Sequence, residues 1–200
     1  MMLSRSQVIL ASTSATRRKL LEDAGARVVV MAPTIDEEVV KESIAGSDPA
    51  DVAMILAQAK AISVSEANRS ALVIGADQVL SLDDRIFNKP KTREEARDQL
   101  LDLRGQRHVL TSAVACALNG EVIWSHDDEA QLVMRQFSND FLGAYLAALD
   151  DEVCDSVGGY KLEGLGSQLF EEIEGDFFTI LGLPLLPLLE FLRSQNVMLT

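Results

Sequence analysis

The residues that follow the first apolar run have the types and spacing to bind a phosphate group. The run Gln7–Ala11 is followed by three hydroxyl residues at 12–14, and then by Arg17 and Arg18. Free backbone N–H groups at a helix start favour an anion, hydroxyls add donors, and the planar guanidinium group matches phosphate oxygens. The alternative interpretation is an ordinary N-cap followed by solvated arginines, which is common in proteins.

Two acidic segments could supply carboxylates to a divalent cation. Asp77 lies within an otherwise apolar run, Val73–Val79, where a charge is unfavourable unless it is paired, hydrogen-bonded or metal-bound. Gly75, two residues earlier, allows another backbone to approach closely. Glu37 lies in an acidic triplet at 36–38, after a predicted strand, and Mg²⁺ accepts a few such oxygens while keeping its waters. In a chain this acidic, a solvated loop is the alternative for the triplet.

Other basic and glycine-rich segments are less specific by themselves. Lys60 borders the apolar face of a predicted helix, where a lysine stem commonly lies along the surface with its ammonium group in water. Lys89, in a loop before a helix cap, could contact a phosphate as a point charge, but taken alone it is indistinguishable from a surface lysine. The segment 157–166 contains four glycines, as ligand sites often do, yet it is neither a Walker A loop nor a Rossmann fingerprint.

The composition excludes several broad classes of protein. The 200 residues are 48% hydrophobic and 24% charged, which predicts a globular chain of one domain or two tightly joined lobes. The net charge of −13, from 18 basic and 31 acidic residues, repels nucleic acid and anionic membranes, so we expect neither as a partner. The apolar run at 180–192 contains two prolines and a glutamate, and is too short to span a bilayer.

The cysteines and histidines do not suggest a site of their own. Cys116 and Cys154 are too few for a disulfide framework or a four-cysteine zinc site, and without a signal peptide we expect a reducing cytoplasm. His108 and His126 lack metal-ligand spacing, so we interpret both as structural. Cys116 lies in an apolar run and is interpreted as a small core residue.

The elements that must position these residues alternate between strand-like and helix-like patterns. Strands are expected at 7–11, 28–32, 72–82, 108–118, 121–125 and 130–136, and helices at 17–24, 49–66, 93–103, 139–149 and 185–194. On the helix 49–66, the predicted inner face consists of Val52, Ile55, Leu56, Ala59 and Ile62. Residues 157–169 are expected to be irregular. A hairpin turn at Asn119-Gly120 predicts an α/β fold whose sheet is not purely parallel.

Taken in order, these segments resemble the Maf family of nucleoside triphosphate pyrophosphatases, over nearly the whole chain. The segments are ILASTSATRRKLLEDAG near the N-terminus, IDE at 35–37, QAKA at 58–61, GADQV at 75–79, NKP at 88–90, GGYKLEGLG at 158–166 and GLP at 182–184. The resemblance implies that residues 1–200 form a single Maf-like domain. The implied fold is a long, mixed, strongly twisted sheet flanked by helices, with two lobes and a central cleft, as in Maf and ITPase-like proteins. A cytoplasmic homodimer is also implied.

The resemblance implies an activity and the residues that perform it. Such enzymes use a divalent cation, Mg²⁺ or Mn²⁺, to hydrolyse a nucleoside triphosphate to the monophosphate and pyrophosphate, and so clear unwanted nucleotides. The catalytic aspartate corresponds to Asp77, which would hold the cation with Glu37 and would align or deprotonate the attacking water. The residues implied in phosphate binding are Ser12, Arg17, Lys60 and Lys89, with Arg18 as a supporting cation. Attack at the α- or the β-phosphorus remains open.

Three positions that track substrate specificity in this family correspond to Thr16, Gln78 and Glu163. The last two agree with the branch that acts on 7-methyl-GTP, whereas Thr16 agrees neither with that branch nor with the dTTP/UTP branch. An ionised Glu163 only accepts hydrogen bonds, and the guanine edge offers N1–H and N2–H₂ donors. Without an aromatic side chain at position 16, a preference for the methylated base over plain guanine stays open.

Two other functions remain open at this point. One is a non-catalytic regulator of septum formation or cell division that binds nucleotide and acts by association. The other is a phosphomonoesterase, which would release orthophosphate in place of pyrophosphate. The identity of the product separates the three.

Overall fold

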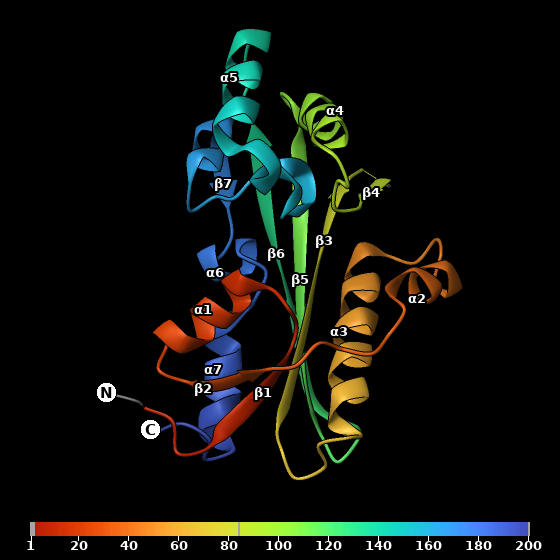
Figure 1. Ribbon diagram of the computed structural model, residues 1–200, viewed down its shortest axis with the longest axis vertical. Helices are drawn as coiled ribbons and strands as arrows, with labels where there is room; N and C mark the ends of the chain where they lie inside the picture. The colour runs from red at the N-terminus through yellow and green to blue at the C-terminus, as the bar shows by residue number, and fades with distance from the viewer. Residues whose placement is uncertain (1–2, 84, 200) are drawn as a thin grey trace. The chain divides into compact units, whose positions relative to one another are not determined.

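The computed structural model describes residues 3–83 and 85–199, which form a seven-stranded mixed sheet with helices packed on it (Figure 1). The strands are β1 (Gln7–Ala11), β2 (Arg27–Val30), β3 (Val73–Leu82), β4 (Arg85–Phe87), β5 (Arg107–Leu118), β6 (Glu121–Met134) and β7 (Phe170–Glu174). Their order is β2-β1-β3-β5-β6-β7, with β4 paired to β3. β2 and β3 run parallel to β1, whereas β4 is antiparallel to β3 and β7 to β6. The predicted mixed α/β sheet is confirmed.

Several helices begin at side-chain caps. The helices are α1 (Ala15–Asp23), α2 (Glu37–Ser43), α3 (Pro49–Ser65), α4 (Arg93–Leu103), α5 (Asn139–Leu149), α6 (Phe177–Ile180) and α7 (Leu185–Ser194), with 3₁₀ turns at Asp150–Cys154, Val157–Gly159 and Leu165–Leu169. Asp48, Thr92 and Ser138 each accept a hydrogen bond from a backbone N–H of the helix that follows. Within the described residues, no helix combines the length and apolarity needed to cross a membrane.

The chain divides into two compact units, which are described separately. Unit 1 comprises Met1–Gln78, Thr111–Asp128 and Phe177–Thr200, and unit 2 comprises Val79–Leu110 and Glu129–Asp176. The strands β3, β5 and β6 each contribute one part to unit 1 and the other part to unit 2.

In unit 1, the sheet is covered on both faces. Val8 and Leu10 of β1 belong to a buried cluster with side chains of α1 and α7, whereas Ile9 and Ala11 pack with Val64 of α3. Because successive side chains of a strand point to opposite faces, α3 covers one face and α1 and α7 cover the other, as the ribbon shows (Figure 1). The same alternation decides which way the polar side chains of β3 point.

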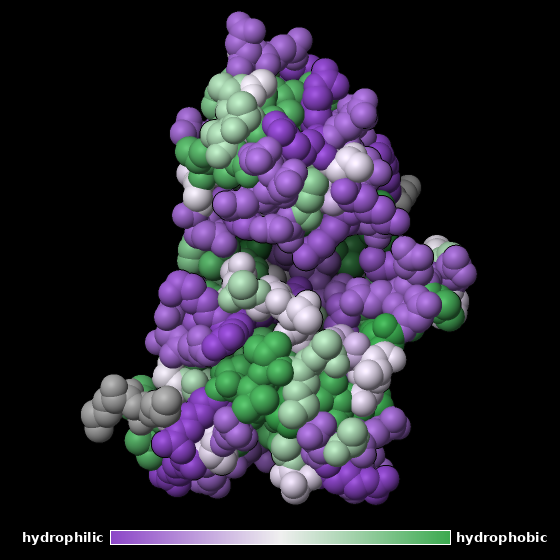
Figure 2. Space-filling model, viewed as in Figure 1, coloured by the Kyte–Doolittle hydropathy of each residue, from purple (hydrophilic) through white to green (hydrophobic). Residues whose placement is uncertain are grey.

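The surface of unit 1 is apolar at one edge. β2 is the last strand at its end of the sheet, and Val30 is exposed there. Figure 2 shows hydrophobic surface gathered over β2, with polar surface over α1 and α2. Most charged side chains of these two helices therefore face solvent.

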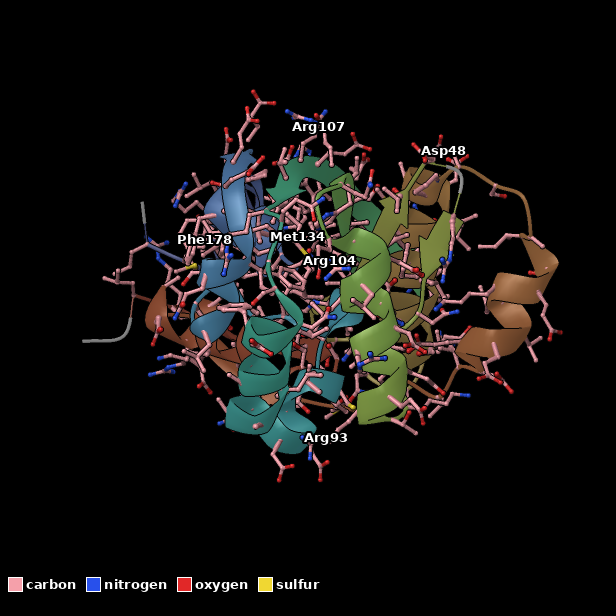
Figure 3. The ribbon with its side chains drawn as sticks, turned by 90° about the horizontal axis from the view of Figure 1, so that it is seen from above. Asp48, Arg93, Arg104, Arg107, Met134 and Phe178 are labelled. Carbon is pink, nitrogen blue, oxygen red and sulfur yellow. The ribbon has the colours of Figure 1, made fainter. Side chains whose placement is uncertain are left out.

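In unit 2, the predicted structural role of His108 is confirmed. The side chain is 1% exposed, and its Nε2 atom lies 2.8 Å from the hydroxyl of buried Tyr160. The neighbouring Arg107 is labelled at the outer rim in Figure 3 and pairs with Glu172 at 3.0 Å and Glu174 at 3.5 Å. The alternation along β5 thus places a neutral ring in the core and a charge at the surface.

Some elements differ from the sequence prediction. β6 is one strand over 121–134, where a break is predicted at its acidic residues, because Asp127 and Glu129 point outward in alternation. Residues 37–43, for which no element is predicted, form α2, and Asp36 caps that helix by accepting from the N–H groups of Glu38 and Val39. The short elements β4, β7 and α6 lack a clear pattern in the sequence.

The buried face of α3 also differs from the prediction. Its buried side chains are Val52, Ala53, Leu56, Ala57, Lys60, Ala61, Val64 and Ser65, whereas Ile55, predicted to lie inside, is 36% exposed. The apolar pattern misleads because it places Lys60 at the border of the helix face. A Cβ added to Gly75 would lie 2.2 Å from the Ala57 oxygen and 2.6 Å from the Ala61 nitrogen. The predicted close approach at Gly75 is therefore confirmed, and it is α3 that approaches.

Candidate functional site

The parallel strands β1 and β3 bring two of the predicted segments together in unit 1. Ala11, the last residue of β1, pairs with Gly75, so Ser12 begins its loop beside the point where β3 continues to Asp77. In α/β sheets, ligands commonly bind beyond the carboxyl ends of parallel strands, where helix N-termini also gather. The topology therefore supports a site in this place.

Lys60 lies at the centre of a buried ionic cluster. Its Nζ atom is 2.6 Å from Oδ1 of Asp77 and 2.9 Å from Oε1 of Glu37. The side chains of Lys60 and Asp77 are 8% and 11% exposed, and that of Glu37 is 44% exposed. The interpretation of Lys60 as a lysine with its ammonium group in water is wrong, because the ammonium group is enclosed and doubly paired.

Arg17 is oriented by backbone carbonyls. Its Nε donates to the Gly182 oxygen at 2.7 Å and its Nη1 to the Ala76 oxygen at 2.9 Å. Within the described residues, Nη2 makes no hydrogen bond. Burial lowers the pKa of Arg17, and the negative charges of Asp77 and Glu37 oppose that shift, but a guanidinium group stays protonated. The arrangement holds a full positive charge in a fixed direction.

Gln78 points to the opposite face of the sheet from Asp77, as the alternation along β3 requires. Its Nε2 atom donates to the carbonyls of Thr179 and Ile180, at 3.1 and 3.0 Å, and to the Ser112 hydroxyl at 3.0 Å. Ser112 in turn donates to the Thr179 carbonyl. Hydrogen bonds to the segment just before Gly182 therefore engage the amide nitrogen of Gln78, whereas its Oε1 atom remains as an acceptor.

The loop before α1 has the features of both interpretations that the sequence allows. Ser14 caps α1 by accepting from the Arg17 N–H at 3.3 Å, as in an ordinary N-cap. Ser12 is 6% exposed, and its Oγ accepts from the Ser14 N–H and lies 3.5 Å from Arg17 Nη1. Thr16 is half-buried, whereas Arg18 is exposed and pairs with Glu22 at 2.8 Å. Of the two arginines, only Arg17 turns toward Asp77.

The remaining predicted residues belong to unit 2. Lys89 is exposed and lies in the loop after β4, and Glu163 is exposed in a turn before the last 3₁₀ turn. The structure thus brings together Ser12, Arg17, Glu37, Lys60 and Asp77 within unit 1.

Asp77 and Glu37 fit a divalent cation that is shared with a substrate. Their carboxylates already converge on one cation, the Lys60 ammonium group. In the part of the chain that the structure describes, no group of three or more His, Cys, Asp or Glu side chains could hold a metal ion by itself. Mg²⁺ commonly takes one or two carboxylates and completes its shell with waters and substrate phosphates. The donor set therefore matches such an ion when a polyphosphate is present.

The sequence does not point to the backbone groups that complete the site. The carbonyls of Ala76 and Gly182 fix Arg17, and those of Thr179 and Ile180 fix Gln78. Carbonyl oxygens belong to every residue, so residue types give no signal for them. The single available signal is Gly182, whose φ of +92° is one that other residues rarely adopt.

Sequence comparisons with known proteins cover nearly the whole chain. A curated relative from Paramagnetospirillum magneticum, "Nucleoside triphosphate pyrophosphatase", is 52% identical over 190 residues, 94% of this chain and 98% of its own. A Brucella abortus relative, "7-methyl-GTP pyrophosphatase", is 48% identical over 192 residues, 95% of this chain and 96% of its own. Among solved structures, a HAM1 protein from Coxiella burnetii is a distant likeness, with a TM-score of 0.43 and 14% identity over 67% of this chain and 73% of that chain. The family model described as "Maf-like protein" matches residues 7–195, and this chain therefore belongs to the Maf-like protein family.

Proposed function

We propose that this chain hydrolyses nucleoside triphosphates to nucleoside monophosphates and pyrophosphate, with residues 1–200 acting as one Maf-like domain. The observation that carries the proposal is the enclosed cluster in unit 1, where Asp77 and Glu37 meet Lys60 beside the fixed guanidinium group of Arg17. Three separate segments and a helix start supply these charged side chains. Packing of the fold does not by itself require a charge at any of these positions. The names of the relatives, one of them a 7-methyl-GTP pyrophosphatase, support this reaction.

The cationic side chains bind the triphosphate in this proposal. Arg17 offers Nη2 to a phosphate oxygen, while its other nitrogens keep the guanidinium plane in place. Lys60 offers its ammonium group as a point charge, and Ser12, Arg18 and Lys89 add further contacts. These cations offset the charge that develops on the pyrophosphate leaving group. Backbone N–H groups at the start of α1 are donors to the same oxygens.

Asp77 is the group that acts on water. Asp77 and Glu37 would hold a divalent cation, Mg²⁺ or Mn²⁺, which would neutralise repulsion between the phosphates when it is bound. Asp77 accepts a proton from the attacking water, or orients it, from the face of β3 that α3 covers. Because that face is enclosed, few other waters compete for the same position.

In this proposal, hydrogen-bond acceptors of the protein select the nucleobase. Gln78 keeps its Oε1 as an acceptor, since its Nε2 is taken by backbone carbonyls, and Glu163 is an acceptor when ionised. The guanine edge has two adjacent donors, so we propose a guanine nucleotide, with Thr16 as the third residue that affects specificity. The remaining parts of the proposal are a homodimer in the cytoplasm with neither nucleic acid nor membrane as partner, and sedimentation of the purified protein tests the dimer.

Pyrophosphate release across a panel of nucleotides tests the function. The panel is 7-methyl-GTP, GTP, dTTP and UTP, each with Mg²⁺ or Mn²⁺. We expect pyrophosphate, with guanine nucleotides preferred, and we expect Asp77→Asn to lower kcat/KM by about 10²- to 10⁴-fold, as loss of a proton acceptor does. Lys89→Ala should also lower it. Lys19→Ala, in an exposed pair with Asp23, is the matched control and should keep wild-type turnover.

Several outcomes contradict the proposal. Orthophosphate in place of pyrophosphate would indicate a phosphomonoesterase, and binding of nucleotide without turnover would indicate a regulator. Wild-type turnover in both Asp77→Asn and Lys89→Ala would show that the site is wrongly assigned. A preference for dTTP or UTP would refute the base assignment alone.

A further inference from the structure

Lys60 occupies the place between the two carboxylates that a divalent cation would need. It is the one buried lysine among residues 3–83 and 85–199, and it extends from the packed face of α3. Its ammonium nitrogen lies 2.6 Å from Asp77 and 2.9 Å from Glu37. A buried charge requires a partner, and in the free protein each member of this cluster has one.

The charges of the cluster are already balanced without a divalent cation. Two carboxylates and one ammonium group sum to one negative charge, and Arg17 supplies a further positive charge nearby. With Arg17 the set has no net negative charge to attract a divalent cation, and Lys60 and Arg17 would repel it at short range, where solvent screens poorly. A triphosphate changes the balance, because its oxygens bring several negative charges and acceptors for both basic side chains.

Lys60 is suited to move between these two sets of partners. Its backbone is fixed within α3, but the four-carbon stem and the rotatable ammonium group allow its head to turn toward phosphate oxygens. Glu37 is on α2, which has no buried residues, so its carboxylate can also adjust. Departure of the ammonium group would leave both carboxylates without a counter-charge, and a divalent cation would restore it.

We propose that Lys60 is a resident counter-cation that keeps divalent metal out of the free protein and gives up the two carboxylates when a triphosphate binds. The inference rests on the proposed function, and it adds an order of binding to it. Metal and nucleotide enter together, and each raises the affinity for the other by the same factor, as thermodynamic linkage requires.

Equilibrium dialysis of Mn²⁺ against the purified protein tests the inference without turnover. The samples are wild type, Lys60→Met and the control Lys19→Met, each with and without α,β-methylene-GTP at equal concentration on both sides of the membrane. Without nucleotide, we expect Lys60→Met to bind Mn²⁺ at least about tenfold more tightly than wild type, within the range of ordinary coupling. Lys19→Met should match wild type. With the analogue, the affinity of wild type should rise by a similar factor.

Equal Mn²⁺ affinities of wild type and Lys60→Met without nucleotide would overturn the inference, and so would wild type that binds Mn²⁺ equally with and without the analogue. The second comparison does not need a variant. If circular dichroism shows that Lys60→Met is unfolded, Lys60→Gln replaces it, because its neutral amide can still donate to Asp77. Turnover with equal Mn²⁺ affinities overturns this inference alone, whereas the expected affinities without turnover overturn only the proposed function.

Discussion

The buried histidine of unit 2 should make the protein less stable in mild acid. Burial lowers the pKa of His108 to about 4, from an ordinary value of 6.5. The folded protein therefore resists protonation of a ring that the unfolded chain protonates readily. The stability that the neutral ring contributes is complete above pH 6.5, and it is lost as the pH falls from 6.5 to about 4. The full difference corresponds to about 3 kcal/mol, of which about 2 kcal/mol is lost by about pH 5.

Urea denaturation at several pH values between 8 and 5 measures this loss. The variant His108→Gln cannot be protonated, and its amide can still bond to the Tyr160 hydroxyl, which lies 2.8 Å from His108 Nε2. We expect its free energy of unfolding to fall with acid by about 2 kcal/mol less than that of wild type. Gly143→Ala, which removes no titratable group and adds a Cβ in open space, is the control and should retain the wild-type slope. Equal slopes for wild type and His108→Gln would refute the reasoning.

Two glycines give further predictions. Gly75→Ala places a Cβ 2.2 Å from the Ala57 oxygen, a backbone atom that cannot move away, so we expect thermal unfolding to show a loss of several kcal/mol or no folded protein. Gly182→Ala places a side chain on a residue with a φ of +92°, and the new Cβ would lie 3.3 Å from Arg17 Nη2, so we expect a folded protein whose kcat/KM is lower by about tenfold. Gly143→Ala, with open space around its Cβ, is the control for both, and a Gly182→Ala enzyme with wild-type turnover would contradict the role of the Gly182 carbonyl.

The sequence predicts the framework of the fold because its signals are local. The caps formed by Asp48 and Thr92 and the turn at Asn119-Gly120 act within a few residues, and the turn and the two helices that follow these caps lie within one residue of where the sequence places them. α2 is not predicted because this helix is short and buries no side chain, so it has no apolar periodicity in the sequence. β7 is not predicted for a related reason, since most of its side chains are exposed.

The candidate site could be predicted in its charges but not in their partners. Asp77 is conspicuous because a carboxylate within an apolar strand demands an explanation. That its partner would be Lys60 depends on the rotation of α3, which small residues at 57, 61 and 75 determine through close packing. Apolar periodicity alone places a lysine at the border of the apolar face of a helix. It contains no information about a carboxylate from another element that makes burial of the lysine favourable.

The two adjacent arginines show how an acidic protein can bind a polyanion. Arg18 pairs with Glu22, so much of its charge is already balanced at the surface. Arg17 is held by the neutral carbonyls of Ala76 and Gly182, which fix its direction without cancelling its charge. The net charge of −13 acts on a large partner such as nucleic acid over the whole surface, but a nucleotide in the site responds mainly to charges within about 10 Å. Binding of a small anion therefore depends on how the nearby cationic side chain is held. A side chain held by carbonyl dipoles keeps its charge for the anion, whereas one paired with a carboxylate does not, and the net charge of the protein does not distinguish the two cases.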